Sequence, residues 1–98
     1  MNSITGITGS ALQAYATSVQ TTAHNVANLN TEGFKASQTT FQENGGGGVT
    51  ATVSGTRDTV DISKEATSLI SDKNSFKANL TVLKTADEMT KELLSIKA

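Results

Sequence analysis

The first 31 residues contain no Asp, Glu, Lys or Arg, so all seventeen charged residues of this 98-residue chain lie within residues 32–98. This uncharged segment of Ala, Ser, Thr, Asn and Gln is too polar for a membrane span, yet it lacks the charges of a solvent-facing helix. Two interpretations remain open from composition alone: a mobile polar tail, or a helix that is surrounded by other protein.

Residue spacing predicts that this segment is a helix from about Ser3 to Leu29, because apolar residues recur at steps of three and four. This seam, with one polar member, consists of Leu12, Tyr15, Val19, Thr22, Val26 and Leu29. A second stripe with the same spacing consists of the small or amide residues Ala11, Ala14, Ser18, Thr21, Asn25 and Asn28. Small side chains allow helices to approach closely, and amides can form hydrogen bonds across an interface.

The helical pattern stops at Leu29 and is followed by a predicted turn. Asn30 and Gly33 both tolerate the positive φ that a helix end and turn require, and Phe34 can fold back onto the apolar seam.

The sequence in the middle of the chain predicts extended structure with a flexible hinge. Residues 36–44 are polar apart from Phe41, and residues 45–48 are four glycines. Residues 49–54 alternate with period two, which indicates a half-buried strand, and residues 59–62 could pair with them across a turn as the second arm of a hairpin.

From about Asp61 the chain predicts one long helix, with Asp61 or Ser63 as the N-cap and Glu65 in the first turn. Pairs of opposite charge four residues apart indicate that one side of this helix faces water. Its apolar stripe follows the three-four spacing and, after a local shift, comprises Ile62, Ala66, Leu69, Phe76, Leu80, Leu83, Ala86, Met89, Leu93 and Ile96, with Lys73 as a charged member.

The predicted fold is mainly α: long N- and C-terminal helices packed as an antiparallel coiled-coil hairpin, with a short extended or β-hairpin insert between them. Residues 1–35, 36–59 and 60–98 are its three segments, and together they form one structural unit. Only 36% of the residues are hydrophobic and only four are aromatic. Two helices alone cannot enclose a core, so the remaining surface implies further copies or a partner, and we expect a homo-oligomer when the chain is isolated.

No pattern of an enzyme or cofactor site is found. The chain has no cysteine, and its single histidine, His24, cannot supply the three or four ligands of a metal site. The glycines at 45–48 lack the Lys that a phosphate loop needs directly after its last glycine. A net charge of -1 offers no basic surface for nucleic acid, and no small-molecule substrate is indicated.

Two stretches at opposite ends of the chain carry a family resemblance. Residues 10–12 (Ser-Ala-Leu) and 23–35 (Ala-His-Asn-Val-Ala-Asn-Leu-Asn-Thr-Glu-Gly-Phe-Lys) resemble the N-terminal signature of the bacterial flagellar rod, hook and hook-filament axial family. Four stretches near the other end resemble the C-terminal region of that family: residues 60–62 (Val-Asp-Ile), 75–79 (Ser-Phe-Lys-Ala-Asn), 83–89 (Leu-Lys-Thr-Ala-Asp-Glu-Met) and 92–94 (Glu-Leu-Leu). The short insert is most similar to the small proximal-rod type. Glu32 is a departure, because the family often has Pro or a small or aliphatic residue there.

The resemblance implies a structural rather than a catalytic protein. Members are exported unfolded through the flagellar type III apparatus without a cleaved signal, and they assemble helically through their terminal helices. Implied partners are further copies, other axial proteins and the export apparatus, and the implied location is the basal-body rod, which spans the periplasm in a Gram-negative cell. A helical-hairpin adaptor or export chaperone for secreted subunits is the alternative.

The residues expected at the assembly interface lie on the two predicted helices and in the turn after the first helix. They are Leu12, Tyr15, Val19, Asn25, Val26, Asn28, Leu29, Asn30, Gly33, Phe34, Leu69, Phe76, Asn79, Leu80, Leu83, Met89 and Leu93.

Overall fold

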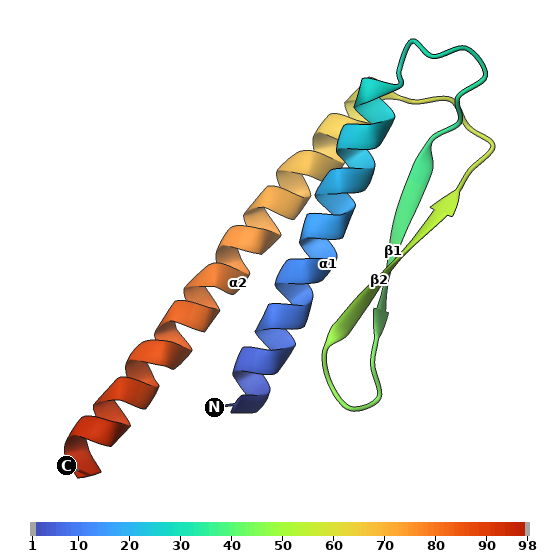
Figure 1. Cartoon of the computed structure of the whole chain (residues 1–98). Coiled ribbons are helices and arrows are strands. Elements are labelled where there is room, and N and C mark those ends of the chain that lie inside the picture. Colours follow the sequence, from blue (N-terminus) through green and yellow to red (C-terminus); the bar gives the residue numbers. More distant parts are fainter. Residues whose placement is uncertain (1, 98) are drawn as a thin grey trace.

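The chain forms two long helices joined by a two-stranded hairpin, in a computed structural model that describes residues 2–97. The elements are α1 (Asn2–Ala27), β1 (Ser37–Glu43), β2 (Val49–Gly55) and α2 (Ile62–Lys97). Figure 1 shows α1 and α2 side by side in opposite directions, with the hairpin beside α1. The predicted antiparallel pair of long helices with a β-hairpin insert is confirmed.

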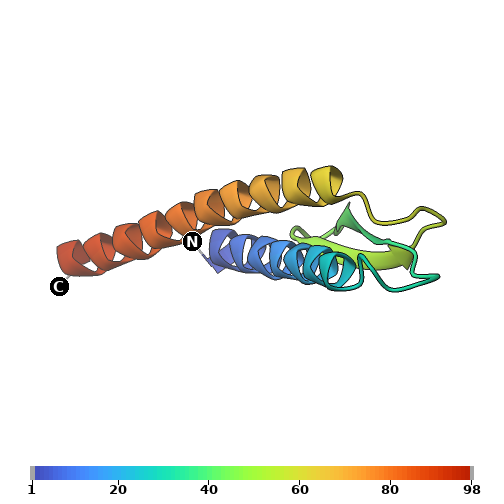
Figure 2. The same ribbon diagram turned by 90° about the horizontal axis from the view of Figure 1, so that it is seen from above.

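The molecule is elongated, with principal dimensions of 63 × 25 × 14 Å. Its radius of gyration is 17.3 Å, whereas a compact domain of this length has about 13 Å. Because α2 has 36 residues and α1 has 26, α2 is longer by about 15 Å at 1.5 Å per residue. Figure 2 shows the C-terminal part of α2 extending past the N-terminal end of α1. That part of α2 therefore lies beyond the described part of α1.

Helix α1 is the element that connects the others. It contacts α2 and both strands, whereas no Cα pair between α2 and the described strands lies within 8 Å. Neither described helix contains a stretch long and apolar enough to cross a bilayer.

The helix boundaries follow from local capping chemistry. Asp61 Oδ1 accepts the backbone N–H of Ser63 at 3.0 Å, which confirms Asp61 as the N-cap of α2. Helix α1 ends at Ala27, two residues earlier than predicted, and the Asn28 side chain donates to the His24 carbonyl at 2.9 Å. Of the two residues expected to adopt positive φ after α1, only Gly33 does, at 76°. Asn30 does not need it, because the chain leaves the helix through tighter turns such as Thr31 N–H to Asn28 O at 3.0 Å.

The predicted strand pairing is wrong. Strand β2 pairs with β1 in an antiparallel register that runs from Ser37 opposite Gly55 to Glu43 opposite Val49. Residues 59–62 are not a strand, because they lead into the N-cap and first turn of α2. The glycines at 45–48 form the hairpin loop rather than a flexible hinge, and Gly47 and Gly48 adopt φ of 95° and 94°, which side-chain-bearing residues rarely adopt.

Gly48 is expected to be intolerant of substitution. A Cβ there would lie 2.9 Å from Ser10 Oγ in addition to requiring positive φ. We expect Gly48→Ala to lower the free energy of unfolding by about 1–3 kcal/mol in urea titrations. Gly46→Ala is the matched control, because a Cβ at Gly46 meets open space. Equal stability of the two variants would show that the loop does not need glycine at position 48.

Candidate assembly interface

The small polar stripe of α1, rather than its apolar seam, is the more deeply buried face of the helix. Ser18, Thr21 and Asn25 are buried, whereas Val26 and Leu29 of the apolar seam are exposed. The described chain buries only three apolar side chains, Ala14, Ala36 and Ala86. The contact between the two helices within the subunit is therefore mostly polar.

The matching face of α2 is also a three-four stripe, of which the predicted apolar stripe includes only Leu83 and Ala86 because the other members are polar. The signal is present in the spacing alone. The residues of this face, all buried or half-buried, are Glu65, Ser68, Asp72, Ser75, Asn79, Leu83, Ala86 and Thr90.

Asn25 joins α1, β1 and α2 at one point. Its Nδ2 donates to the Ser37 carbonyl at 2.8 Å and to Glu65 Oε1 at 3.0 Å, and its Oδ1 accepts the Ser37 N–H at 2.9 Å. Asn25 is 1% exposed and is the largest fully buried side chain among the described residues. In this structure it is inaccessible to a second subunit, so its place at an assembly interface is corrected to a role within the subunit.

A second polar contact joins the helices further along. The Ser18 hydroxyl donates to Asp72 Oδ2 at 2.5 Å, and both side chains are buried. No described Lys, Arg or His side chain forms a salt bridge with Asp72, since the one salt bridge in residues 2–97 joins Lys91 and Asp87. The carboxylate is therefore stabilised by hydrogen bonding rather than by an ion pair.

Removing one member of the Ser18–Asp72 contact is expected to lower the free energy of unfolding more than removing both. Ser18→Ala leaves a buried carboxylate without its donor, and we expect a loss of about 1–3 kcal/mol in the free energy of unfolding. The double variant Ser18→Ala/Asp72→Leu replaces both with apolar groups and should regain most of that loss. A double-mutant cycle by urea unfolding measures the coupling, and additive losses would contradict it.

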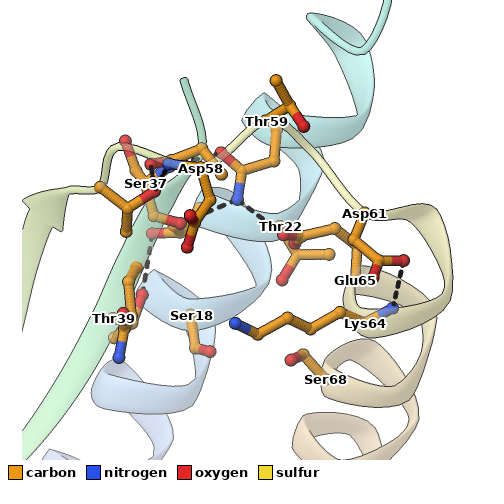
Figure 3. A pocket seen from close by; sticks show the side chains of 15 residues that line it. Ser18, Thr22, Ser37, Thr39, Asp58, Thr59, Asp61, Lys64, Glu65 and Ser68 are labelled. Atoms are coloured by element: carbon orange, nitrogen blue, oxygen red, sulfur yellow. Dashed lines mark hydrogen bonds between the residues drawn. The ribbon is translucent and has the colours of Figure 1, made fainter. Parts of the chain in front are cut away.

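A groove of about 460 Å³ lies beside these contacts, between the C-terminal half of α1, the start of β1 and the first turns of α2. Figure 3 shows its lining as mainly hydroxyl, amide and carboxylate side chains, with the Lys64 side chain extended across it. Within residues 2–97 no group of three or more His, Asp or Glu side chains could hold a metal ion. His24 is exposed, and its ring lies edge-on to that of Phe34 with centroids 5.3 Å apart.

The turn after α1 is held mainly by local contacts. Asn28 is half-buried, and its Oδ1 accepts the Thr31 hydroxyl at 3.2 Å. Asn30 and Gly33 are exposed, and Phe34 is half-buried with its ring edge-on to that of His24. The turn thus presents Asn30 and Gly33 at the surface.

Large apolar side chains lie on the outside of the subunit. Among the predicted interface residues Val26, Leu29, Leu69, Leu80, Met89 and Leu93 are exposed, and Leu12, Tyr15, Val19, Phe76, Asn79 and Leu83 are half-buried. Ile62 and Leu69 are seven residues apart and form a stripe near the start of α2, and Val82, Met89 and Ile96 form another near its end. Leu69 and Val82 lie about 140° apart around the helix at 100° per residue, so α2 exposes apolar surface on two sides.

Two family matches coincide with the two ends of the chain. Residues 7–35 match the family model described as "Flagella basal body rod protein", and residues 58–96 match that described as "Flagellar basal body rod FlgEFG protein C-terminal". No curated protein matches the chain. The matched segments contain most of α1 with its turn and nearly all of α2, and they leave β1 and β2 outside.

Proposed function

The chain belongs to the flagellar basal body rod protein family, and from this membership we propose that it is a rod subunit that is exported by the flagellar type III apparatus and self-assembles through its terminal helices. The family has a structural role in the basal body and is not a family of enzymes. Its partners are other flagellar rod proteins, and we propose further copies of this chain and the export apparatus in addition.

The observation that carries the self-assembly proposal is that polar side chains lie between the helices while large apolar side chains lie on the outside of the subunit. The contact between α1 and α2 is mostly polar, whereas exposed apolar residues occur along both helices. Leu69 is 43% exposed and Met89 is 55% exposed. Large apolar side chains that are exposed along one stripe of a helix often mark a contact with another protein.

The charge distribution supports the same proposal. The side of α1 that faces away from both α2 and the hairpin consists of uncharged residues, and Gln13, Ala16, Gln20 and Ala23 are all exposed there. The exposed charges of the helical pair are on α2 instead, including the Lys91–Asp87 pair at 3.2 Å. Helix α1 therefore has the surface of a helix that is covered in an assembly.

We propose that the interface comprises the exposed and half-buried members of the predicted set. They are Leu12, Tyr15, Val19, Val26, Asn28, Leu29, Asn30, Gly33, Phe34, Leu69, Phe76, Asn79, Leu80, Leu83, Met89 and Leu93.

The isolated chain is expected to be weakly stable or oligomeric, because its apolar stripes have no partner within the subunit. Analytical ultracentrifugation over a range of concentrations should show self-association, and the unfolding midpoint should rise with protein concentration. A sharp two-state unfolding transition from a dilute monomer would contradict this expectation.

The export proposal is tested by fractionating cells with and without a working type III apparatus. The protein should leave the cytoplasm only when the apparatus works, and its mass should be the same before and after export. A protein that stays in the cytoplasm and binds one secreted client at fixed stoichiometry would instead be the adaptor or export chaperone.

A further inference from the structure

The two outer edges of the β1–β2 hairpin carry backbone groups that point away from the partner strand. Asn44 N–H donates to Gly48 O at 3.0 Å and Thr56 N–H donates to Ala36 O at 2.9 Å. The even-numbered residues of β1 are therefore the ones whose backbone groups form hydrogen bonds with β2. In an antiparallel ladder the alternate residues then direct their N–H and C=O groups outward. These are residues 37, 39, 41 and 43 of β1 and residues 49, 51, 53 and 55 of β2.

Helix α1 occupies one outward position on each edge, at opposite ends of the hairpin. Asn25 bonds both backbone groups of Ser37, and the Ser10 hydroxyl accepts the Val49 N–H at 2.9 Å. The other outward residues form no further hydrogen bond through these groups within the described chain. Three consecutive outward positions therefore stay open on each edge: Thr39, Phe41 and Glu43 on β1, and Ala51, Val53 and Gly55 on β2.

These edges lack the features with which proteins usually prevent strand addition. Protected edges carry Lys, Pro or a bulge, or are covered by a helix. Here the fourteen strand residues include one charged residue, Glu43, and the chain has no proline. The register continues without a bulge, and no Cα atom of α2 lies within 8 Å of a Cα atom of either described strand.

We propose that β1 of one copy of this chain pairs with β2 of a second copy in the same orientation, so that neighbouring subunits share a continuous antiparallel sheet. This inference rests on the proposed self-assembly of the rod subunit. One register matches all six open positions: Phe41 opposite Val53 of the second copy, Thr39 opposite its Gly55, and Glu43 opposite its Ala51.

The exposed apolar residues of the hairpin select this partner and this register. Phe41 is 41% exposed and Val53 is 50% exposed, and they are the large apolar residues that the described hairpin leaves at its surface. The register places them directly opposite each other, as an aromatic and β-branched cross-strand pair. The side chains at positions 38, 40, 42, 50, 52 and 54 share one face of the hairpin, and all of them are Gln, Thr or Ser. Neighbouring copies can therefore adjoin on this face without repulsion between like charges.

The geometry is compatible with packing of the helices. Two strands advance a sheet by about 9.6 Å, close to the 8–10 Å at which helix axes pack. The register also displaces the second copy by two residues along the strands, about 7 Å. A repeated displacement of this kind gives a helical rather than a flat assembly.

Cysteine cross-linking tests the pairing, because the chain has no cysteine of its own. Phe41→Cys and Val53→Cys are expressed together in one cell, basal bodies are isolated, and mild oxidation is applied. Directly opposite Cα atoms lie about 5.5 Å apart, within disulfide range. A disulfide-linked dimer is expected in the mixed preparation and in neither single-variant preparation. Glu43→Cys with Ala51→Cys tests the same register without removing the contact of Phe41 with Tyr15.

Each other outcome overturns the proposal. Dimers from Phe41→Cys alone would mean pairing of β1 with β1, and dimers from Val53→Cys alone would mean pairing of β2 with β2. A link from Phe41→Cys to a different protein would mean another partner. Basal bodies that contain both variants without either cross-link would refute the shared sheet and leave the rod function intact, whereas absence of the wild-type chain from basal bodies would refute the proposed function.

Discussion

Asn25→Ala is expected to lower the free energy of unfolding by about 3 kcal/mol, because it removes the partner of one buried carboxylate and of two part-buried backbone groups. The two backbone groups of Ser37 and the carboxylate of Glu65 all lose the same amide. Urea unfolding at one fixed protein concentration measures the loss. The Ser37 amide proton should also exchange faster with solvent, which separates release of β1 from a general loss of stability.

Asn28→Ala is the matched control, because it removes the same side chain three residues further along the same helix. Asn28 is half-buried, and its side chain bonds to His24 and Thr31 within the local turn. Its loss should cost about 1 kcal/mol and leave exchange at Ser37 unchanged. If the two variants are equally stable, Asn25 does not join the three elements as we describe.

Leu69→Asp is expected to abolish incorporation into the rod while the free chain keeps its stability to within about 0.5 kcal/mol. Leu69 is 43% exposed in the subunit, so the new carboxylate stays hydrated there. In an assembled rod the same carboxylate would be transferred into a packed apolar contact, at a cost of several kcal/mol. Incorporation is measured by quantitative blotting of isolated basal bodies, together with swimming assays.

Asn74→Asp provides the control for added charge. Asn74 is also exposed on α2 but lies about 180° around the helix from Glu65, on the side away from α1. This variant should assemble normally. Val26→Asp repeats the test on the exposed seam of α1, and normal motility in both the Leu69 and Val26 variants would contradict an interface at these stripes.

The parts of the fold that the sequence predicts well are set by local chemistry. Asp61 is recognisable as a helix cap because its carboxylate accepts N–H groups only two and three residues away. Both helices follow from residue spacing, and Gly33 follows from the conformation that only glycine adopts readily. The strand pairing was missed because four successive glycines look flexible in sequence, although Gly47 and Gly48 are fixed in a tight loop.

The interior of the subunit could not be predicted by following apolar residues. The partners of Asn25 lie twelve and forty residues away, and that of Ser18 lies fifty-four residues away. No local pattern reveals such pairs. Each helix nevertheless carries a stripe of small and polar residues at steps of three and four, and these two matching stripes indicate that the helices contact each other through polar side chains. That the apolar stripes bind other subunits stays a prediction.

Immunogold electron microscopy of isolated basal bodies tests the central claim most directly. An antibody against this chain, or against an epitope inserted in the exposed loop at Gly46, should label the rod in the wild type and nothing in a strain that lacks the gene. Labelled rods would support a structural subunit assembled through its helices. Unlabelled basal bodies from cells that contain the protein in their cytoplasm would contradict it.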